Sequence, residues 1–277
     1  MDGHGLDTSF HFDRDRLASL GAEHHAHYVA ARPFPHTVID DFLPDDVLDR
    51  VLAEFPTGGE ESWLRFESDN ERKLASTAET PMGEATRQLL AEFNSSAFVD
   101  FLEQLTGIDG LVPDPHFEGG GMHQIVRGGH LNVHVDFNRH PRTGLDRRLN
   151  ALMYLNRQWK DEYGGALELW STDGRRCERR VAPLFNRLVV FSTTESSYHG
   201  HPSPLNCPPD MTRKSLAFYY YSLPAAAQNG SGPGTHNTVW KPEHVGRERA
   251  KTIVRRLAPP VLVDLVRAAR RRSRAEL

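Results

Sequence analysis

The sequence predicts an α+β protein whose core is an antiparallel β-barrel or jelly roll. Helix-period segments dominate the first part of the chain, and from residue 115 short strands with turn signals between them follow one another. Many short, evenly spaced strands are typical of barrels and jelly rolls. Because no linker separates the regions, we expect one compact unit with three parts: a support region (1–114), a β-core (115–224) and a C-terminal extension (225–277).

The support region contains one expected strand and two helical segments. Residues 34–44 read as a strand that ends at Pro44, and residues 45–56 have apolar side chains at helical spacing with acids in the first turn. A second helical region covers 84–106 and is expected to break near residues 94–96. The polar, histidine-rich residues 1–27 predict a loosely ordered lead or a short helix.

The β-core contains seven expected strands. Glycine- and proline-containing turns separate them, including RGG, PRTG, YGG and TDG. The expected strands are 122–126, 131–137, 149–155, 166–170, 178–182, 187–192 and 214–222.

The sequence of the C-terminal extension predicts a basic helix. An apolar stripe in 259–277 precedes five arginines between Arg267 and Arg274. A helix on a membrane surface or on RNA is one interpretation. A terminal helix that docks on the fold with a solvated basic end is the interpretation we favour.

Composition excludes several functional classes. The 277 residues carry a formal net charge of −4 and 38% hydrophobic content, which favours neither nucleic acid nor membrane insertion. The two cysteines cannot make a disulfide framework. No signal peptide and no apolar run of ~18 residues are visible, so the expectation is a cytoplasmic protein.

Residues 130–137, HLNVHVDF, alternate strictly between polar and apolar side chains, as expected of a strand with one polar face. His134 and Asp136 share that face, where Cβ atoms two positions apart are roughly 6–7 Å from each other. That spacing allows both side chains to bind one metal ion. A third ligand must come from elsewhere, and His199 or His201, after the apolar strand 187–192, can supply it. Two histidines and one carboxylate form the facial triad of non-haem Fe(II) oxygenases.

Arg213 and Ser215 share a face at the start of the last strand. An arginine with a hydroxyl two positions later is well suited to binding a carboxylate. A buried arginine is costly without an anion, and a dicarboxylate cosubstrate would supply one.

From about Gly119 to Ser222 the sequence resembles the prolyl-hydroxylase-like branch of the 2-oxoglutarate/Fe(II) dioxygenases. The motifs that carry the resemblance are HVD (134–136), LMYLNRQWKDEYGGALELW (152–170), PLFNRLVVF (183–191), SYHG (197–200) and TRKS (212–215). The resemblance implies a double-stranded β-helix, that is, a cupin-like jelly roll, with supporting N-terminal helices.

The resemblance also implies residue roles. His134, Asp136 and His199 would bind Fe(II), and the family match selects His199 over His201. Arg213 would bind the distal carboxylate of 2-oxoglutarate together with Tyr154. The other residues expected around the cosubstrate are Ser215, Gln124, Asn150 and Leu152, with Gln124 at a position where some relatives place a tyrosine.

The implied reaction is hydroxylation of an unactivated C–H bond in a prolyl, amino-acid or small natural-product substrate, with release of succinate and CO₂. Fe(II), 2-oxoglutarate and O₂ would be required, with ascorbate as an optional addition. In halogenating relatives a small residue stands at the position of Asp136, so the carboxylate favours hydroxylation, or a related oxidation such as desaturation or ring closure. Two alternatives are a cupin-like metal enzyme without 2-oxoglutarate and a non-catalytic binding protein. The former would not need Arg213 with Ser215, and the latter would not need all three ligands.

Overall fold

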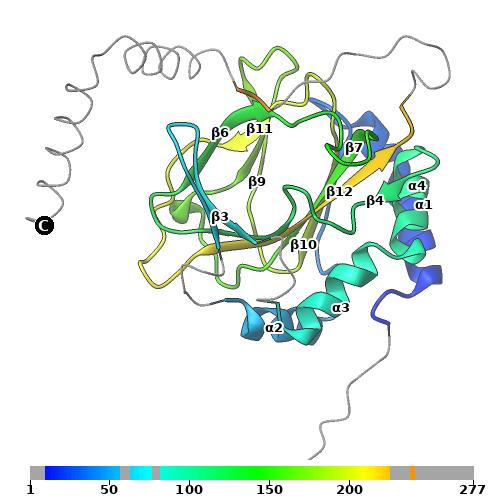
Figure 1. Cartoon of the computed structure of the whole chain (residues 1–277), viewed down its shortest axis with the longest axis horizontal. Helices are drawn as coiled ribbons and strands as arrows, with labels where there is room; N and C mark the ends of the chain where they lie inside the picture. The colour runs from blue at the N-terminus through cyan, green and yellow to red at the C-terminus, as the bar shows by residue number, and fades with distance from the viewer. Residues whose placement is uncertain (1–9, 57–62, 77–81, 225–237, 241–277) are drawn as a thin grey trace, which may run out of the picture. The chain divides into compact units, whose positions relative to one another are not determined.

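A nearly closed antiparallel barrel forms the centre of the computed structural model (Figure 1). The structure describes residues 10–56, 63–76, 82–224 and 238–240. The basic helix expected at the C-terminus therefore lies outside the described residues. Hydrogen-bonded neighbours in the barrel follow the order β1-β10-β7-β12-β5-β3-β6-β11-β8-β9. These strands are β1 (His36–Ile39), β3 (Glu71–Ser76), β5 (Gly121–Ile125), β6 (His130–Val135), β7 (Asp146–Tyr154), β8 (Leu167–Trp170), β9 (Cys177–Val181), β10 (Arg187–Ser192), β11 (His199–His201) and β12 (Arg213–Ser222).

Shorter elements and helices complete the described chain. Strand β2 (Leu64–Glu67) makes a hairpin with β3, and β4 (Val112–Pro113) pairs with the end of β12. The remaining elements are α1 (Arg14–Ala30), α2 (Asp45–Glu54), β2 (Leu64–Glu67), α3 (Glu84–Phe93), α4 (Ser96–Thr106), β4 (Val112–Pro113), the 3₁₀ helix η2 (Asp161–Tyr163) and β13 (Val239–Trp240).

The predicted fold class is confirmed, and each of the seven expected strands of the β-core is present with ends shifted by at most three residues. The sequence did not reveal the β2–β3 hairpin. Strand β2, Leu-Arg-Phe-Glu, alternates between apolar and polar residues over only four positions, too few for a clear signal, and all four are exposed. Strand β11 was also missed, because three residues are too few for a periodic pattern.

The helices agree with the predicted support region in most respects. The expected break near residues 94–96 separates α3 from α4. The helix expected in residues 1–27 is longer than predicted. Helix α1 has 17 residues, and its N-cap, Asp13, accepts a hydrogen bond from the backbone N–H of Arg16. Only Leu17, Gly21 and Tyr28 of α1 are buried, and so few apolar positions leave a weak helical signal.

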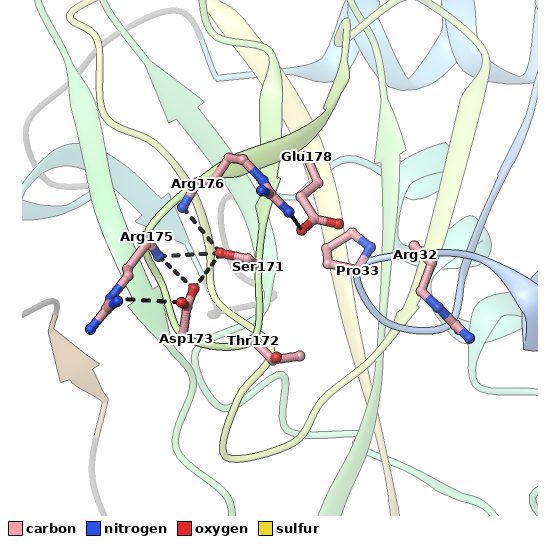
Figure 2. A pocket seen from close by; sticks show the side chains of 8 residues that line it. All are labelled: Arg32, Pro33, Ser171, Thr172, Asp173, Arg175, Arg176 and Glu178. Carbon is pink, nitrogen blue, oxygen red and sulfur yellow. Dashed lines mark hydrogen bonds and ion pairs between the residues drawn. The ribbon is translucent and has the colours of Figure 1, made fainter.

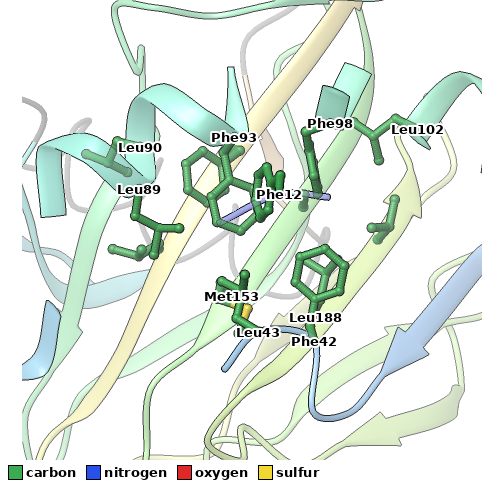
Figure 3. Close-up of a cluster of buried hydrophobic side chains, with 14 of the residues drawn as sticks. Phe12, Phe42, Leu43, Leu89, Leu90, Phe93, Phe98, Leu102, Met153 and Leu188 are labelled. Atoms are coloured by element: carbon green, nitrogen blue, oxygen red, sulfur yellow. The ribbon is translucent and has the colours of Figure 1, made fainter. Parts of the chain in front are cut away.

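An aromatic cluster joins the helices to the outer face of the barrel (Figure 3). The rings of Phe93 on α3 and Phe218 on β12 are stacked with centroids 4.1 Å apart, and Phe98 on α4 packs edge-on against Phe93 at 4.7 Å. Met153 of β7 contributes to the same cluster. Since side chains alternate along a strand, the neighbouring positions of β7 and β12 face the barrel interior. The helices thus fix which side chains of these two strands line the site.

Among the described residues, no helix combines the length and the apolar character that crossing a membrane would require.

Candidate active site

Two adjacent strands bring the predicted metal ligands together. His134 on β6 and His199 on β11 are directly opposite each other in the antiparallel ladder, and their ring centroids are 4.5 Å apart. Asp136 follows β6 immediately, on the same face as His134. Cross-strand pairing therefore supplies the third side chain that the local HxD pattern lacks.

The three side chains form a compact, buried donor set. The Nε2 atom of His134 lies 3.4 Å from Oδ1 of Asp136, and Nε2 of His199 lies 3.3 Å from Oδ2 of Asp136. One donor atom from each residue falls within 4.8 Å of the others. Within the described chain, this is the cluster of histidine, cysteine and carboxylate side chains able to hold a metal ion, and it contains His199 rather than His201.

Backbone carbonyls orient both imidazole rings. Nδ1 of His134 lies 2.8 Å from the carbonyl oxygen of Asn132, and Nδ1 of His199 lies 2.9 Å from that of Ser197. A carbonyl oxygen can only accept, so Nδ1 carries the proton and Nε2 presents a lone pair toward Asp136. This second hydrogen bond is typical of metal-binding histidines, because it fixes the tautomer and the ring orientation. Burial lowers the pKa of His199 to about 4, which keeps the ring neutral at physiological pH.

Asp136 is held by two side chains that lie outside the donor set. Asn150 donates a hydrogen bond from Nδ2 to Oδ2 of Asp136 at 2.8 Å, and the guanidinium of Arg147 lies 3.1 Å from the same oxygen. Arg147 also donates to Oδ1 of Asn150 at 3.0 and 2.6 Å. Burial alone would raise the pKa of Asp136, but the charge of Arg147 holds it well below its usual range. The carboxylate is therefore ionised.

Arg147 is the site residue that the sequence analysis missed. It is 4% exposed, and its guanidinium lies 3.5 Å from the ring centroid of Tyr219 and 4.6 Å from that of Phe137. These aromatic faces stabilise a cation away from water. The partners come from β12 and from the segment after β6, so no local pattern around Arg147 could have indicated its position.

A second buried arginine lies in the barrel, on β12. Arg213 is 5% exposed; it donates from Nε to the carbonyl oxygen of Gly165 at 2.7 Å and from an Nη to the hydroxyl of Tyr154 at 3.1 Å. Gly165 has φ of +73°, and a Cβ there would lie 2.9 Å from Cδ of Arg213. Glycine is thus needed both for the turn and for the close approach of the arginine.

Both hydrogen-bond acceptors of Arg213 are neutral. Within the described residues, no carboxylate forms an ion pair with this guanidinium, whereas Arg147 has Asp136. A buried, unpaired guanidinium is unfavourable, and a bound carboxylate would neutralise it and occupy its free N–H donors. The arrangement therefore suits a carboxylate ligand.

The other predicted cosubstrate residues divide between the two faces of the barrel wall. Ser215 shares the inward face of β12 with Arg213, and Leu152 shares that of β7 with Tyr154. Asn150 also points inward, but it contacts Asp136 and Arg147. The placement of Gln124 was wrong. Its ladder partner is Lys214, while Arg213 and Ser215 pair with Ile125 and His123, so Gln124 lies on the opposite face.

A surface pocket of about 620 Å³ lies away from these residues (Figure 2). It is lined by the β8–β9 turn together with Arg32 and Pro33, and two of its arginines are paired, Arg175 with Asp173 and Arg176 with Glu178. Its lining includes none of the donor set and neither buried arginine, so its size does not make it the site of chemistry.

Residues 120–221 match the family model of the 2OG-Fe(II) oxygenase superfamily. No curated protein sequence matches the chain.

Solved structures with the same fold include three prolyl hydroxylases. One, from Trichoplax adhaerens in complex with a hypoxia-inducible-factor peptide, has a TM-score of 0.54 and 16% identity over 78% of this chain and 94% of that chain. A prolyl-4-hydroxylase from Pseudomonas putida has a TM-score of 0.52 and 20% identity over 74% of this chain and 98% of that chain. A prolyl 4-hydroxylase from Phytophthora capsici has a TM-score of 0.50 and 22% identity over 79% of this chain and 69% of that chain.

The barrel is accordingly a 2OG-Fe(II) oxygenase domain. Residues 120–221 match a superfamily whose chemistry requires Fe(II), 2-oxoglutarate and O₂, and the fold is shared with prolyl hydroxylases. The described residues fit both a metal ion and a dicarboxylate cosubstrate. The buried donor set has the composition of a facial triad, and the buried arginine lacks an anion.

Proposed function

We propose that His134, Asp136 and His199 hold Fe(II) and that the protein hydroxylates an unactivated C–H bond. The mutual approach of the three donor atoms within 4.8 Å supports the ligand assignment, as does the Nδ1 hydrogen bond of each histidine. Asn150 and Arg147 would orient the carboxylate through Oδ2. Replacing a residue that hydrogen-bonds to a metal-binding side chain typically lowers metal affinity about 10- to 100-fold.

Arg213 would bind the distal carboxylate of 2-oxoglutarate, assisted by Tyr154 and Ser215. The observation that carries this assignment is the absence of any carboxylate partner for a buried guanidinium among the described residues. Nε is bonded to Gly165 and one Nη N–H to Tyr154, which leaves the other guanidinium N–H groups for the ligand. A cupin-like enzyme without a dicarboxylate cosubstrate would have no use for this arrangement.

When bound, iron supplies the activation of O₂, with 2-oxoglutarate converted to succinate and CO₂ and one oxygen atom inserted into the substrate C–H bond. The chain contributes the ligand geometry and the ionised state of Asp136, and Arg213 fixes the orientation of the cosubstrate. Because Asp136 occupies the position that is small in halogenating relatives, hydroxylation is favoured over halogenation.

The substrate we propose is a prolyl residue, a free amino acid or a small natural product. Prolyl compounds are the first class to test, because the solved structures of this fold include prolyl hydroxylases. This is an argument from fold, and one fold supports many substrates.

Mass spectrometry of the iron-loaded protein tests the proposal. The full chain is incubated with 2-oxoglutarate, O₂ and, in turn, free amino acids, proline-containing peptides and a fractionated cell extract. We expect succinate in amounts equal to a product that has gained one oxygen atom. Asp136→Ala is the inactive control, and Asp173→Asn, at an exposed turn, is the active one. Equal succinate from wild type and Asp136→Ala would reject the proposed site.

A further inference from the structure

His201 is a buried histidine that the proposed metal site does not use. It lies two residues after His199 on β11 and is 3% exposed. The ladder between β11 and β6 shifts register between these two histidines, so His199 pairs with His134 whereas His201 pairs with Leu131. That shift separates His201 from the donor set even though the two side chains are close in sequence.

Neither ring nitrogen of His201 has a hydrogen-bond partner among the described residues. By contrast, His134 and His199 each have Nδ1 bonded to a backbone carbonyl. Other buried side chains of the described residues have single unsatisfied atoms, but both ring nitrogens of His201 lack a partner. Leaving a buried donor or acceptor unsatisfied is unfavourable, and native proteins rarely do so without a ligand or water at the site.

The surroundings of His201 indicate which kind of ligand it would meet. It lines a cavity of about 550 Å³ together with Gly165, the residue whose carbonyl oxygen holds Nε of Arg213. The permanent cations whose charge acts on His201 include Arg213 and Lys73, and Lys73 is paired with Glu71 at 3.0 Å, which leaves Arg213 as a nearby cation without a carboxylate partner among the described residues. The acidic members of the cavity wall are Asp161 and Glu168, and Glu168 is paired with Arg180 at 3.1 Å. A site with this electrostatic character favours an anion.

We propose that His201 is a positioning residue for the cosubstrate, donating an imidazole N–H hydrogen bond to the distal carboxylate of 2-oxoglutarate beside Arg213. The inference rests on the proposed function, because that function places the carboxylate at Arg213. It adds a neutral donor to the cationic one, so two different side chains determine how the dicarboxylate is oriented. An ordered water that satisfies His201 is the competing occupant.

Calorimetric binding to the Zn(II)-loaded full chain tests the proposal without turnover. His201→Leu keeps the volume but removes the donor, and we expect 2-oxoglutarate affinity to fall about 10- to 100-fold, as for the loss of a hydrogen bond to a charged group. His201→Gln restores an N–H donor and should bind within about threefold of wild type. Zn(II) affinity should be unchanged in both variants. His201→Ala replaces the leucine variant if that protein does not fold.

The matched control ligand is 2-oxopentanoate, which has the same chain but a methyl group in place of the distal carboxylate. Wild type and His201→Leu should bind it equally. A double-mutant cycle combines His201→Leu with Arg213→Ala. In the Arg213→Ala background, the loss of 2-oxoglutarate affinity caused by His201→Leu should be smaller by at least about twofold, because both residues bind one carboxylate.

The outcomes separate the two proposals. If 2-oxoglutarate binds wild type no better than 2-oxopentanoate, the proposed function fails. If Arg213→Ala weakens 2-oxoglutarate but His201→Leu does not, the role of His201 alone fails and a water is its partner. Loss of Zn(II) from His201→Leu would instead make His201 a metal ligand and overturn the inference.

Discussion

The barrel interior contains two buried arginines in opposite electrostatic situations. Arg147 lies 3.1 Å from the carboxylate of Asp136, donates to Asn150 and is covered by Tyr219. Arg213 is equally buried, but its acceptors are a backbone carbonyl and a phenol. We call the first group the metal end (His134, Asp136, His199, Arg147 and Asn150) and the second the clamp end (Arg213, Tyr154, Gly165 and His201).

The difference indicates which parts of the site are complete before ligands bind. At the metal end every charge has a partner within the chain, so the carboxylate is fixed in advance of the iron. At the clamp end a cation and an imidazole lack partners that a dicarboxylate would provide. We therefore expect substitutions at the metal end to affect both the folded protein and its metal, and those at the clamp end to affect mainly the cosubstrate.

The largest expected effect is on the donor set. His134→Ala, Asp136→Ala or His199→Ala should abolish Fe(II)-dependent succinate formation, because each removes one of the three proposed protein ligands. Metal content and turnover are measured together, with Asp173→Asn as the control. Turnover close to wild type in any of the three variants would exclude that residue as a ligand.

Arg147→Met should lower the free energy of unfolding of the metal-free protein by roughly 3–5 kcal/mol, since Asp136 then remains buried without its cation. Arg213→Met should change that free energy much less, because no buried carboxylate loses a partner. Urea denaturation of both variants measures the contrast. Equal destabilisation would mean that the two ends do not differ as the structure indicates.

Arg213→Ala should weaken 2-oxoglutarate binding by roughly 30- to 1,000-fold, equivalent to about 2–4 kcal/mol for a charge-assisted bidentate contact. Metal affinity should survive, and Lys at this position should rescue only partly, because a point charge cannot reproduce the planar guanidinium. Calorimetry is the measurement, and Arg157→Ala, an exposed arginine paired with Asp49, is the matched control. An unchanged affinity would remove Arg213 from the cosubstrate site.

Metal-free protein should lose stability as pH falls. Burial lowers the pKa of His199 from 6.5 to about 4, so between these values the unfolded chain binds a proton that the folded chain does not. Burial and nearby cations also lower the pKa of His201. Stability is fully present above pH 6.5 and declines toward pH 4, which denaturation at pH 7 and pH 5 would detect. His201→Leu should show a shallower decline than wild type, and a parallel decline would contradict this account.

The smallest expected effect belongs to Tyr154→Phe. The change removes one neutral hydroxyl that accepts from Arg213, worth about 1 kcal/mol, so 2-oxoglutarate affinity should fall about fivefold. A loss as large as that of Arg213→Ala would show that the phenol, and not the guanidinium, dominates binding.

Local sequence determined the elements whose signals are periodic or strongly marked. Alternation placed His134 and Asp136 on one face of a strand, and Arg213 and Ser215 on one face of another, because side chains of a strand repeat every two residues. The same reasoning located the strands of the β-core and the break between α3 and α4. Family resemblance supplied the likeness of the site to a 2-oxoglutarate oxygenase and favoured His199 over His201.

Tertiary structure decided the features of the site that depend on strand pairing. Spacing alone could not choose between His199 and His201, and the register shift between β11 and β6 puts only His199 opposite His134. Strand pairing likewise turned Gln124 away from the clamp end and brought Arg147 to Asp136. These contacts join residues on different strands or on either side of a loop, and the packing of helices on the outer face decides which residues point inward. No periodic pattern within one segment contains that information.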